Sequence, residues 1–138
     1  MSNVINMTVP GNPDYIKVCR NTAMAAASVM KLDVDAVDEI GMAVYEACKA
    51  ITCHGHDCWA KTYTLNIEML DENLTITVQA TGQHDVEKCK KICLDCPKEG
   101  DLGIAIIKSI MDKVEIEKEG NNSKKITMVK NYAKQNII

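Results

Sequence analysis

The chain has 138 residues, a length that fits one domain, so we expect residues 1–138 to form a single unit. Its 16 Lys and Arg against 19 Asp and Glu leave a net charge of −3, and without a basic excess direct nucleic-acid binding is disfavoured. The longest uncharged apolar stretch, residues 22–30, is too short to span a bilayer, and the N-terminus lacks the pattern of a signal peptide. We therefore expect a cytoplasmic protein without membrane contact.

The first third of the chain predicts one strand and two helices. Residues 5–9 alternate apolar and polar side chains, as a half-buried strand does. Asn12, followed by a proline, is typical of a helix start, and an alanine-rich run follows it. Either Asp33 or Asp35 caps a second helix, because apolar side chains recur at helical spacing over residues 37–51.

The middle of the chain predicts a β-hairpin and then a long irregular segment. Residues 63–69 and 74–78 each alternate, with a turn between them. From residue 79 to residue 100 the periodicity is lost in a stretch rich in Lys, Cys, Asp and Gly, so we expect a cysteine-rich insertion at about 80–100.

The last part predicts a third helix and a closing hairpin. Asp101 is in a position to cap the helix, and residues 114–116 and 126–128 read as the two strands. The resulting order of elements predicts an α/β two-layer sandwich, with the helices on one face of a mixed, mostly antiparallel sheet.

Three segments of the sequence resemble the nucleotide boxes of the GHKL ATPases, which include gyrase B, histidine kinases and small anti-sigma factor serine kinases. The segments are DEIGMAVYEACKAITCHGH, ITVQATGQHD and KEGDLGIAIIKSIMDKVEI, and the closing ITMVK is similar to the family's last strand. They stand in the family's order and cover roughly residues 4–130. The resemblance is closest to the anti-sigma factor serine kinases of partner-switching systems.

This resemblance implies the two-layer Bergerat fold, ATP and Mg²⁺ as ligands, and Glu46 as the general base of a phosphotransfer reaction. It also implies partners: a sigma factor, a small anti-sigma antagonist and a second copy of the chain in a homodimer. The positions that it assigns to the nucleotide site are Glu46, Lys49, Ala50, Gly82, Gly100, Leu102 and Gly103.

Several of those positions depart from the family's pattern. Ala50 stands where an Asn helps to hold Mg²⁺, and Ala80 stands where an Asp accepts the adenine amino proton. Loss of that one hydrogen bond is worth about 1.5–3 kcal/mol, or one to two decades of affinity. Asp101 replaces a glycine of the lid box and adds negative charge beside the expected phosphates. We therefore predict a regulator that keeps partner binding while ATP binding and phosphotransfer are weakened or lost.

The seven cysteines leave a second function open. Cys89, Cys93 and Cys96 have the spacing C-x3-C-x2-C, which can hold an Fe–S cluster, or Zn with His84 or Cys58 as a further ligand. On this interpretation the chain is a metal or redox sensor on a degenerate ATPase fold; free loop thiols are the simpler alternative. The third hypothesis is a still-active ATP-dependent protein serine kinase, and the last is a purely structural subunit.

Overall fold

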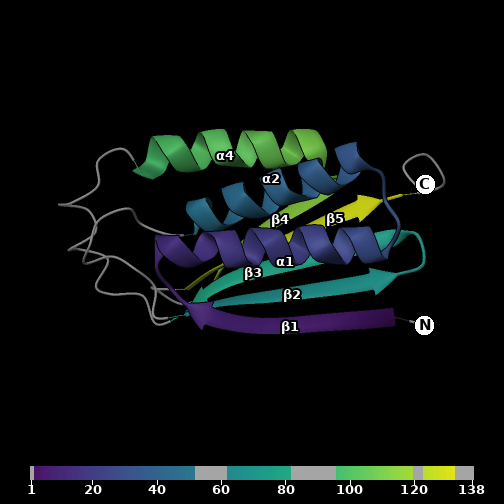
Figure 1. The fold of residues 1–138 in the computed structure, drawn as a ribbon. Coiled ribbons are helices and arrows are strands. Elements are labelled where there is room, and N and C mark those ends of the chain that lie inside the picture. Colours follow the sequence, from purple (N-terminus) through teal and green to yellow (C-terminus); the bar gives the residue numbers. More distant parts are fainter. Residues whose placement is uncertain (1, 52–61, 82–95, 120–122, 133–138) are drawn as a thin grey trace.

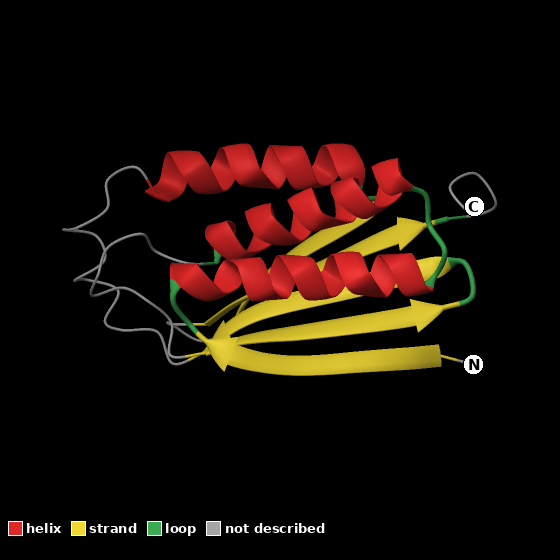
Figure 2. Cartoon of the chain, viewed as in Figure 1, coloured by secondary structure: helices red, strands yellow, loops and turns green. Residues whose placement is uncertain are grey.

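We analysed a computed structural model, which describes residues 2–51, 62–81, 96–119 and 123–132. Three α-helices of the described residues cover one face of a five-stranded sheet (Figures 1 and 2). In chain order the elements are β1 (Ser2–Pro10), the 3-10 helix η1 (Pro13–Tyr15), α1 (Ile16–Val29), α2 (Val34–Ala50), β2 (Thr62–Leu70), β3 (Asn73–Thr81), α4 (Cys96–Ile110), β4 (Lys113–Glu119) and β5 (Ser123–Asn131).

The sheet has the order β1-β2-β3-β5-β4, and each of its four pairs is antiparallel. The predicted two-layer sandwich is confirmed, whereas the expectation of a mixed sheet is wrong for the described strands. Because β2 and β3 are joined by a two-residue turn and β4 and β5 by a short connection, β3 runs back beside β2 and β5 runs back beside β4. Alternate residues of β2 and β3 are buried, so one face of the sheet packs against the helices and the other is polar.

Two side chains that the sequence marks as caps start the first two helical segments. The Oδ1 atom of Asn12 accepts a hydrogen bond from the backbone N of Asp14 at 3.0 Å. Asp33, rather than Asp35, caps α2, because its Oδ1 accepts from the backbone N of Ala36 at 2.8 Å. Each bond satisfies one N–H that the first helical turn leaves without a partner.

The boundaries of two other elements differ from the prediction. Helix α4 begins at Cys96, five residues before Asp101, and a proline in its first turn suits a helix start because it lacks an N–H that would be left unpaired. Strand β3 continues to Thr81, and its last residues pair with β5, as in the pair of Gln79 and Lys125. Pairing with the neighbouring strand thus extends β3 beyond the residues whose alternating pattern predicts a strand.

The core lies between the two layers and is mostly aliphatic, with two buried tyrosines. Its largest fully buried side chains are Tyr63, Tyr132, Ile40, Ile51, Leu65, Ile67, Leu74, Ile76, Ile107, Ile126, Met128 and Val44. None of the described helices is long and apolar enough to cross a membrane.

Candidate nucleotide site between α2 and α4

Glu46 lies in the last turns of α2 and faces α4. Its side chain is only 14% exposed, and its Oε2 lies 3.8 Å from the Nζ of Lys49, three residues further along the helix. The ammonium group of Lys49 also lies 5.3 Å from the ring centroid of Tyr45. The carboxylate is thus shielded on one side and flanked by a cation, which itself contacts an aromatic ring.

Gly103 brings α4 against this carboxylate. A Cβ atom added at Gly103 would lie 2.9 Å from Oε2 of Glu46, 3.6 Å from its backbone oxygen and 3.7 Å from its Cβ. Real Cβ atoms essentially never approach a heavy atom within 3.0 Å, so the glycine makes room for the acidic side chain. The first and third sequence boxes, far apart in the chain, therefore meet at this pair.

Three other residues that the sequence assigns to the nucleotide site also lie in the described part of the chain. Ala50 lies one turn beyond Glu46, where it is partly buried and packs against the core. Leu102 is 65% exposed on α4, next to the buried Gly103. Gly100 lies within α4. The structure thus brings Glu46 and Gly103 into contact, while Leu102 projects toward solvent.

Several predicted site residues lie outside the described residues: Gly82, His84, Cys58, Cys89 and Cys93. Cys96 is described only as the first residue of α4. In the described ranges no three His, Cys, Asp or Glu side chains are arranged to hold a metal ion. The Fe–S or Zn interpretation therefore gains no support.

The donor set around Glu46 does not fit Mg²⁺ well. Magnesium is held by oxygen ligands, commonly one or two carboxylates together with substrate phosphates. Glu46 supplies one carboxylate, but Ala50 has no side-chain oxygen and Lys49 adds a positive charge 3.8 Å from the same carboxylate. Ala80 is fully buried on β3 and has no polar atom for an adenine. Glu46 itself retains what a general base needs, an acceptor oxygen at a partly open position.

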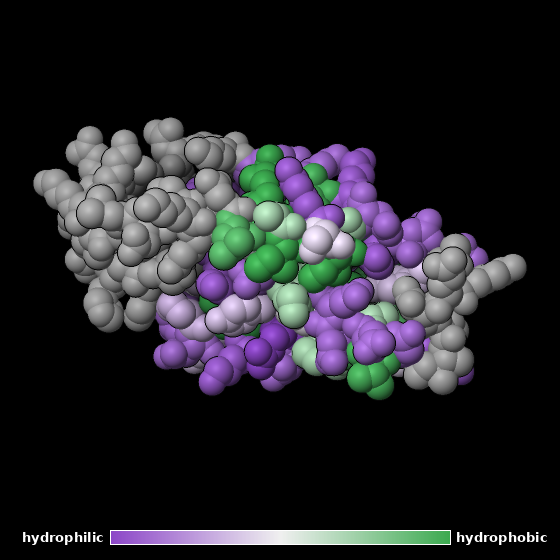
Figure 3. All heavy atoms as spheres, turned by 90° about the horizontal axis from the view of Figure 1, so that it is seen from above, coloured by the Kyte–Doolittle hydropathy of each residue, from purple (hydrophilic) through white to green (hydrophobic). Residues whose placement is uncertain are grey.

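Sequence reasoning missed a groove between α1 and α2, of about 510 Å³, beside the Glu46 site. Its lining includes Arg20 and Met24 of α1 and Met42 and Tyr45 of α2. Met42 is among the most exposed apolar side chains of the helix layer, and Figure 3 shows hydrophobic residues gathered on this face. The available signal was Gly41, since a glycine inside a helix often marks a close approach.

Two thiols lie buried inside the same helix pair. Cys19 of α1 and Cys48 of α2 are 1% and 0% exposed, so they pack as small buried hydrophobic side chains. The side-chain hydrogen bond between them lowers the pKa of Cys19, and the same bond together with burial raises the pKa of Cys48 well above its ordinary value. These two thiols pack the core and lie outside the candidate site.

Comparison with known proteins defines the class. Residues 9–130 match the histidine kinase-like ATPase domain, so the chain belongs to that family. It is 29% identical to the serine-protein kinase RsbW of Halalkalibacterium halodurans, over 83% of this chain and 76% of the relative. Staphylococcus epidermidis RsbW is 26% identical over 96% of this chain and 89% of that protein. The anti-sigma F factor of Clostridium acetobutylicum is 28% identical, with 83% of each chain covered. These relatives confirm the resemblance to anti-sigma factor kinases.

Proposed function

We propose that this protein is a transcriptional regulator of the anti-sigma factor type, which acts by binding protein partners and has weakened or lost ATP-dependent phosphotransfer. Its partners are a sigma factor and a small antagonist protein, and it works as a homodimer in the cytoplasm. Its similarity to serine-protein kinase RsbW and to anti-sigma F factor supports the regulatory class. The observation that carries the loss of catalysis is the site itself, where alanines occupy the positions expected for Mg²⁺ and adenine ligands.

Protein binding needs other features than phosphotransfer does, and the chain retains them. The helix layer presents a groove beside exposed apolar side chains, of which Met42 is 52% exposed. Interfaces are anchored by a few apolar or aromatic side chains that become buried, with polar groups around them. Arg20 and Asp38 line the same groove and supply such polar groups.

A direct test is to recover the tagged protein from its native cells and identify what is bound. We expect a sigma factor, an antagonist protein or both to co-purify. Met42→Glu should weaken their recovery at least tenfold because it places a charge in the groove. Val34→Glu is the matched control, since Val34 is a similarly exposed apolar residue of α2 outside the groove lining. Absence of both partners from the wild-type sample would contradict the regulatory proposal.

The second candidate function, an active protein serine kinase, is favoured by one observation. Glu46 is present and lies against Gly103, so the base and the lid box keep their contact. We expect the wild type to bind Mg-ATP weakly in a calorimetric titration and Ala50→Asn to strengthen that binding. Tight Mg-ATP binding by the wild type, with phosphate transfer to a partner serine that Glu46→Ala abolishes, would establish the kinase.

Metal analysis of the same anaerobically purified sample addresses the sensor alternative. We expect less than one iron or zinc per five chains, because on the proposed function Cys89, Cys93 and Cys96 are free thiols. One iron or zinc per chain, lost in a triple Cys89→Ser, Cys93→Ser, Cys96→Ser variant, would replace the present proposal with a metal-dependent regulator.

A further inference from the structure

The buried thiols of Cys19 and Cys48 belong to two helices that lie side by side over the sheet (Figure 1). The buried side chains around them are small, since three alanines of α1 and three of α2 are buried with the thiols. Small side chains let the backbones of two packed helices approach closely. A disulfide needs Cα atoms about 4.4–6.8 Å apart, so a close approach is what a bond between facing cysteines requires.

Gly41 shows which sides of the two helices meet. A Cβ atom added at Gly41 would lie 2.6 Å from Sδ of Met24 and 3.5 Å from Cγ of Arg20, so Gly41 faces α1. Cys48 comes seven residues after Gly41, about two helical turns, and therefore lies on the same side of α2. Because the two helices run antiparallel, a later residue of α2 meets an earlier residue of α1. The contact of Cys48 with Cys19 thus continues the contact of Gly41 with Met24.

The two thiols are not equivalent. The S–H group of Cys48 donates a hydrogen bond to the sulfur of Cys19, which lowers the pKa of Cys19. The same bond and burial raise the pKa of Cys48 well above its ordinary value. Since the thiolate is the reactive form of cysteine, Cys19 is the thiol that reacts first with an oxidant. Cys48 already contacts its sulfur and is placed to react second.

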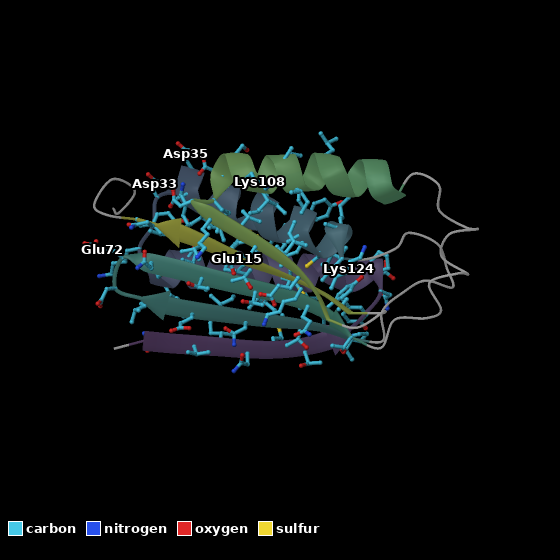
Figure 4. All side chains as sticks on the ribbon, turned by 180° about the vertical axis from the view of Figure 1, so that it is seen from behind. Asp33, Asp35, Glu72, Lys108, Glu115 and Lys124 are labelled. Atoms are coloured by element: carbon cyan, nitrogen blue, oxygen red, sulfur yellow. The ribbon has the colours of Figure 1, made fainter. Side chains whose placement is uncertain are left out.

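The thiol pair also lies beside the groove between α1 and α2. Arg20 follows Cys19 directly, Tyr45 is three residues before Cys48, and both line the groove. This part of α2 is remote from Asp33 and Asp35, which Figure 4 shows where the helix begins. A bond between the two sulfur atoms therefore connects both walls of the groove. Because the thiols are closed to solvent, an oxidant reaches them through local opening of the helix pair.

We propose that Cys19 and Cys48 form a disulfide in response to peroxide, which cross-links α1 to α2 beside the groove. The Cys19 thiolate attacks one oxygen of hydrogen peroxide, the O–O bond breaks, and a Cys19 sulfenic acid and hydroxide result. The Cys48 sulfur then attacks the Cys19 sulfur, and the hydroxyl leaves with the Cys48 proton as water. The hydroxide takes up the proton that Cys19 released. The two thiols thus lose two electrons, and peroxide is reduced to two molecules of water.

Peptide mapping of the full, folded chain tests whether this bond forms. The protein is treated with hydrogen peroxide, its remaining thiols are blocked with N-ethylmaleimide, and trypsin is added without a reductant. Cleavage after Lys and Arg leaves Cys19 in the peptide 18–20 and Cys48 in the peptide 32–49, each as the only cysteine. We expect these two peptides as one linked species, two hydrogens lighter than their sum and separated by dithiothreitol. The cross-link should raise Tm by about 5 °C, reversibly.

Two serine variants separate the roles of the thiols, because a serine hydroxyl keeps a hydrogen-bond donor but forms no disulfide. In Cys48→Ser, the Cys19 sulfenic acid has no thiol to resolve it, so dimedone should label the peptide 18–20. In Cys19→Ser, labelling of Cys48 should be at least fivefold lower. Neither variant should show the rise in Tm that peroxide causes in the wild type.

A control and the contrary outcomes complete the test. Peroxide treatment of the chain unfolded in guanidinium should reduce the share of the 18–20 and 32–49 pair at least threefold, because only the fold selects it. Wild type in which Cys19 and Cys48 stay free, or are linked to other cysteines, would overturn the proposed disulfide, and this mapping is decisive even when a variant does not fold. Preferred labelling of Cys48 would overturn the order of reaction. None of these results touches the regulatory proposal, which partner capture tests.

Discussion

The helix layer contains two close contacts that are each built on a glycine, and they differ in what the glycine faces. At the α1–α2 contact, a Cβ on Gly41 would lie 2.6 Å from Sδ and 2.8 Å from Cγ of Met24. At the α2–α4 contact, a Cβ on Gly103 would meet the carboxylate of Glu46. The first contact packs apolar side-chain atoms of two helices together. The second shields the carboxylate of Glu46, which is not part of the hydrophobic core.

The difference indicates which contact holds the fold and which one serves the site. Thioether and aliphatic atoms gain stability by being packed, so filling Gly41 pushes the helices apart. A partly exposed carboxylate gains little from packing and can rotate into solvent, so Gly103 has a local role. Five predictions follow, from the largest effect on stability to the smallest.

Gly41→Leu should destabilise the protein by about 3 kcal/mol, because the added side chain overlaps Met24 inside the α1–α2 contact. Chemical denaturation of wild type and variant measures the loss. In the double variant with Met24→Ala, at least half of the stability should return, since the smaller side chain opens the space. Equal losses in the single and double variants would show that Met24 is not the obstacle.

Tyr132→Phe should stabilise the protein by about 1.5 kcal/mol at neutral pH, because the buried Tyr132 hydroxyl has no hydrogen-bond partner among the described residues. Burial, followed by the negative charges of Glu39, Asp112 and Asp33, raises the pKa of Tyr132 above its usual 10.0. Asp33 and Glu39 lie at the start of α2, and Asp112 lies between α4 and β4. This prediction therefore concerns the end of the α2–α4 pair that is far from Glu46.

The same tyrosine gives a pH dependence of known sign. The phenol of Tyr132 stays protonated in the folded state, whereas in the unfolded chain it ionises above pH 10. Ionisation stabilises only the unfolded chain, so the free energy of unfolding is unaffected by this group below pH 10 and falls above it. Wild type should lose up to about 1.4 kcal/mol per pH unit more than Tyr132→Phe between pH 10 and 11. Parallel stability curves for the two proteins would contradict the raised pKa.

Lys130→Met should cost about 1 kcal/mol, because the Nζ of Lys130 donates to the backbone oxygen of Ile110 at the C-terminal end of α4 over 2.8 Å. This hydrogen bond connects the C-terminal end of α4 to β5. It therefore helps to fix the position of the helix that contains Gly103. Thermal unfolding measures the effect, with Lys113→Met as control, since the ion pair of Lys113 with Glu115 is exposed. The control should change stability by less than about 0.5 kcal/mol.

Gly103→Ala should change stability by less than about 0.5 kcal/mol, because the helix propensity gained by alanine offsets the displaced carboxylate. Gly41→Ala, its matched partner, should cost about 1 kcal/mol because its added Cβ would lie 2.6 Å from Sδ of Met24, closer than the 2.9 Å approach at Gly103. In the Ala50→Asn background, Gly103→Ala should lower Mg-ATP affinity about tenfold, a free-energy change of about 1.4 kcal/mol. Equal losses of stability at the two glycines would show that the Gly41 contact does not stabilise the fold more than the Gly103 contact does.

Local sequence patterns determined the element types, their order and two caps. Alternation marked the strands, the 3.6-residue period marked the helices, and Asn12 and Asp33 sit where short polar side chains satisfy free N–H groups. The three boxes identified the family, which the match over residues 9–130 confirms. Glu46 and Gly103 were identified from the boxes as well, because each box is a continuous stretch of sequence.

The tertiary structure alone decided what depends on residues far apart in the chain. Pairing with β5 extended β3, and the contact of Glu46 with Gly103, the α1–α2 groove and the place of β1 at one edge of the sheet arise only when the elements pack. A strand's pattern shows which of its faces is buried, but its place at an edge or in the middle is set by its neighbours. The sequence of β1 therefore records an uncharged strand, and only the fold shows that one of its sides is open.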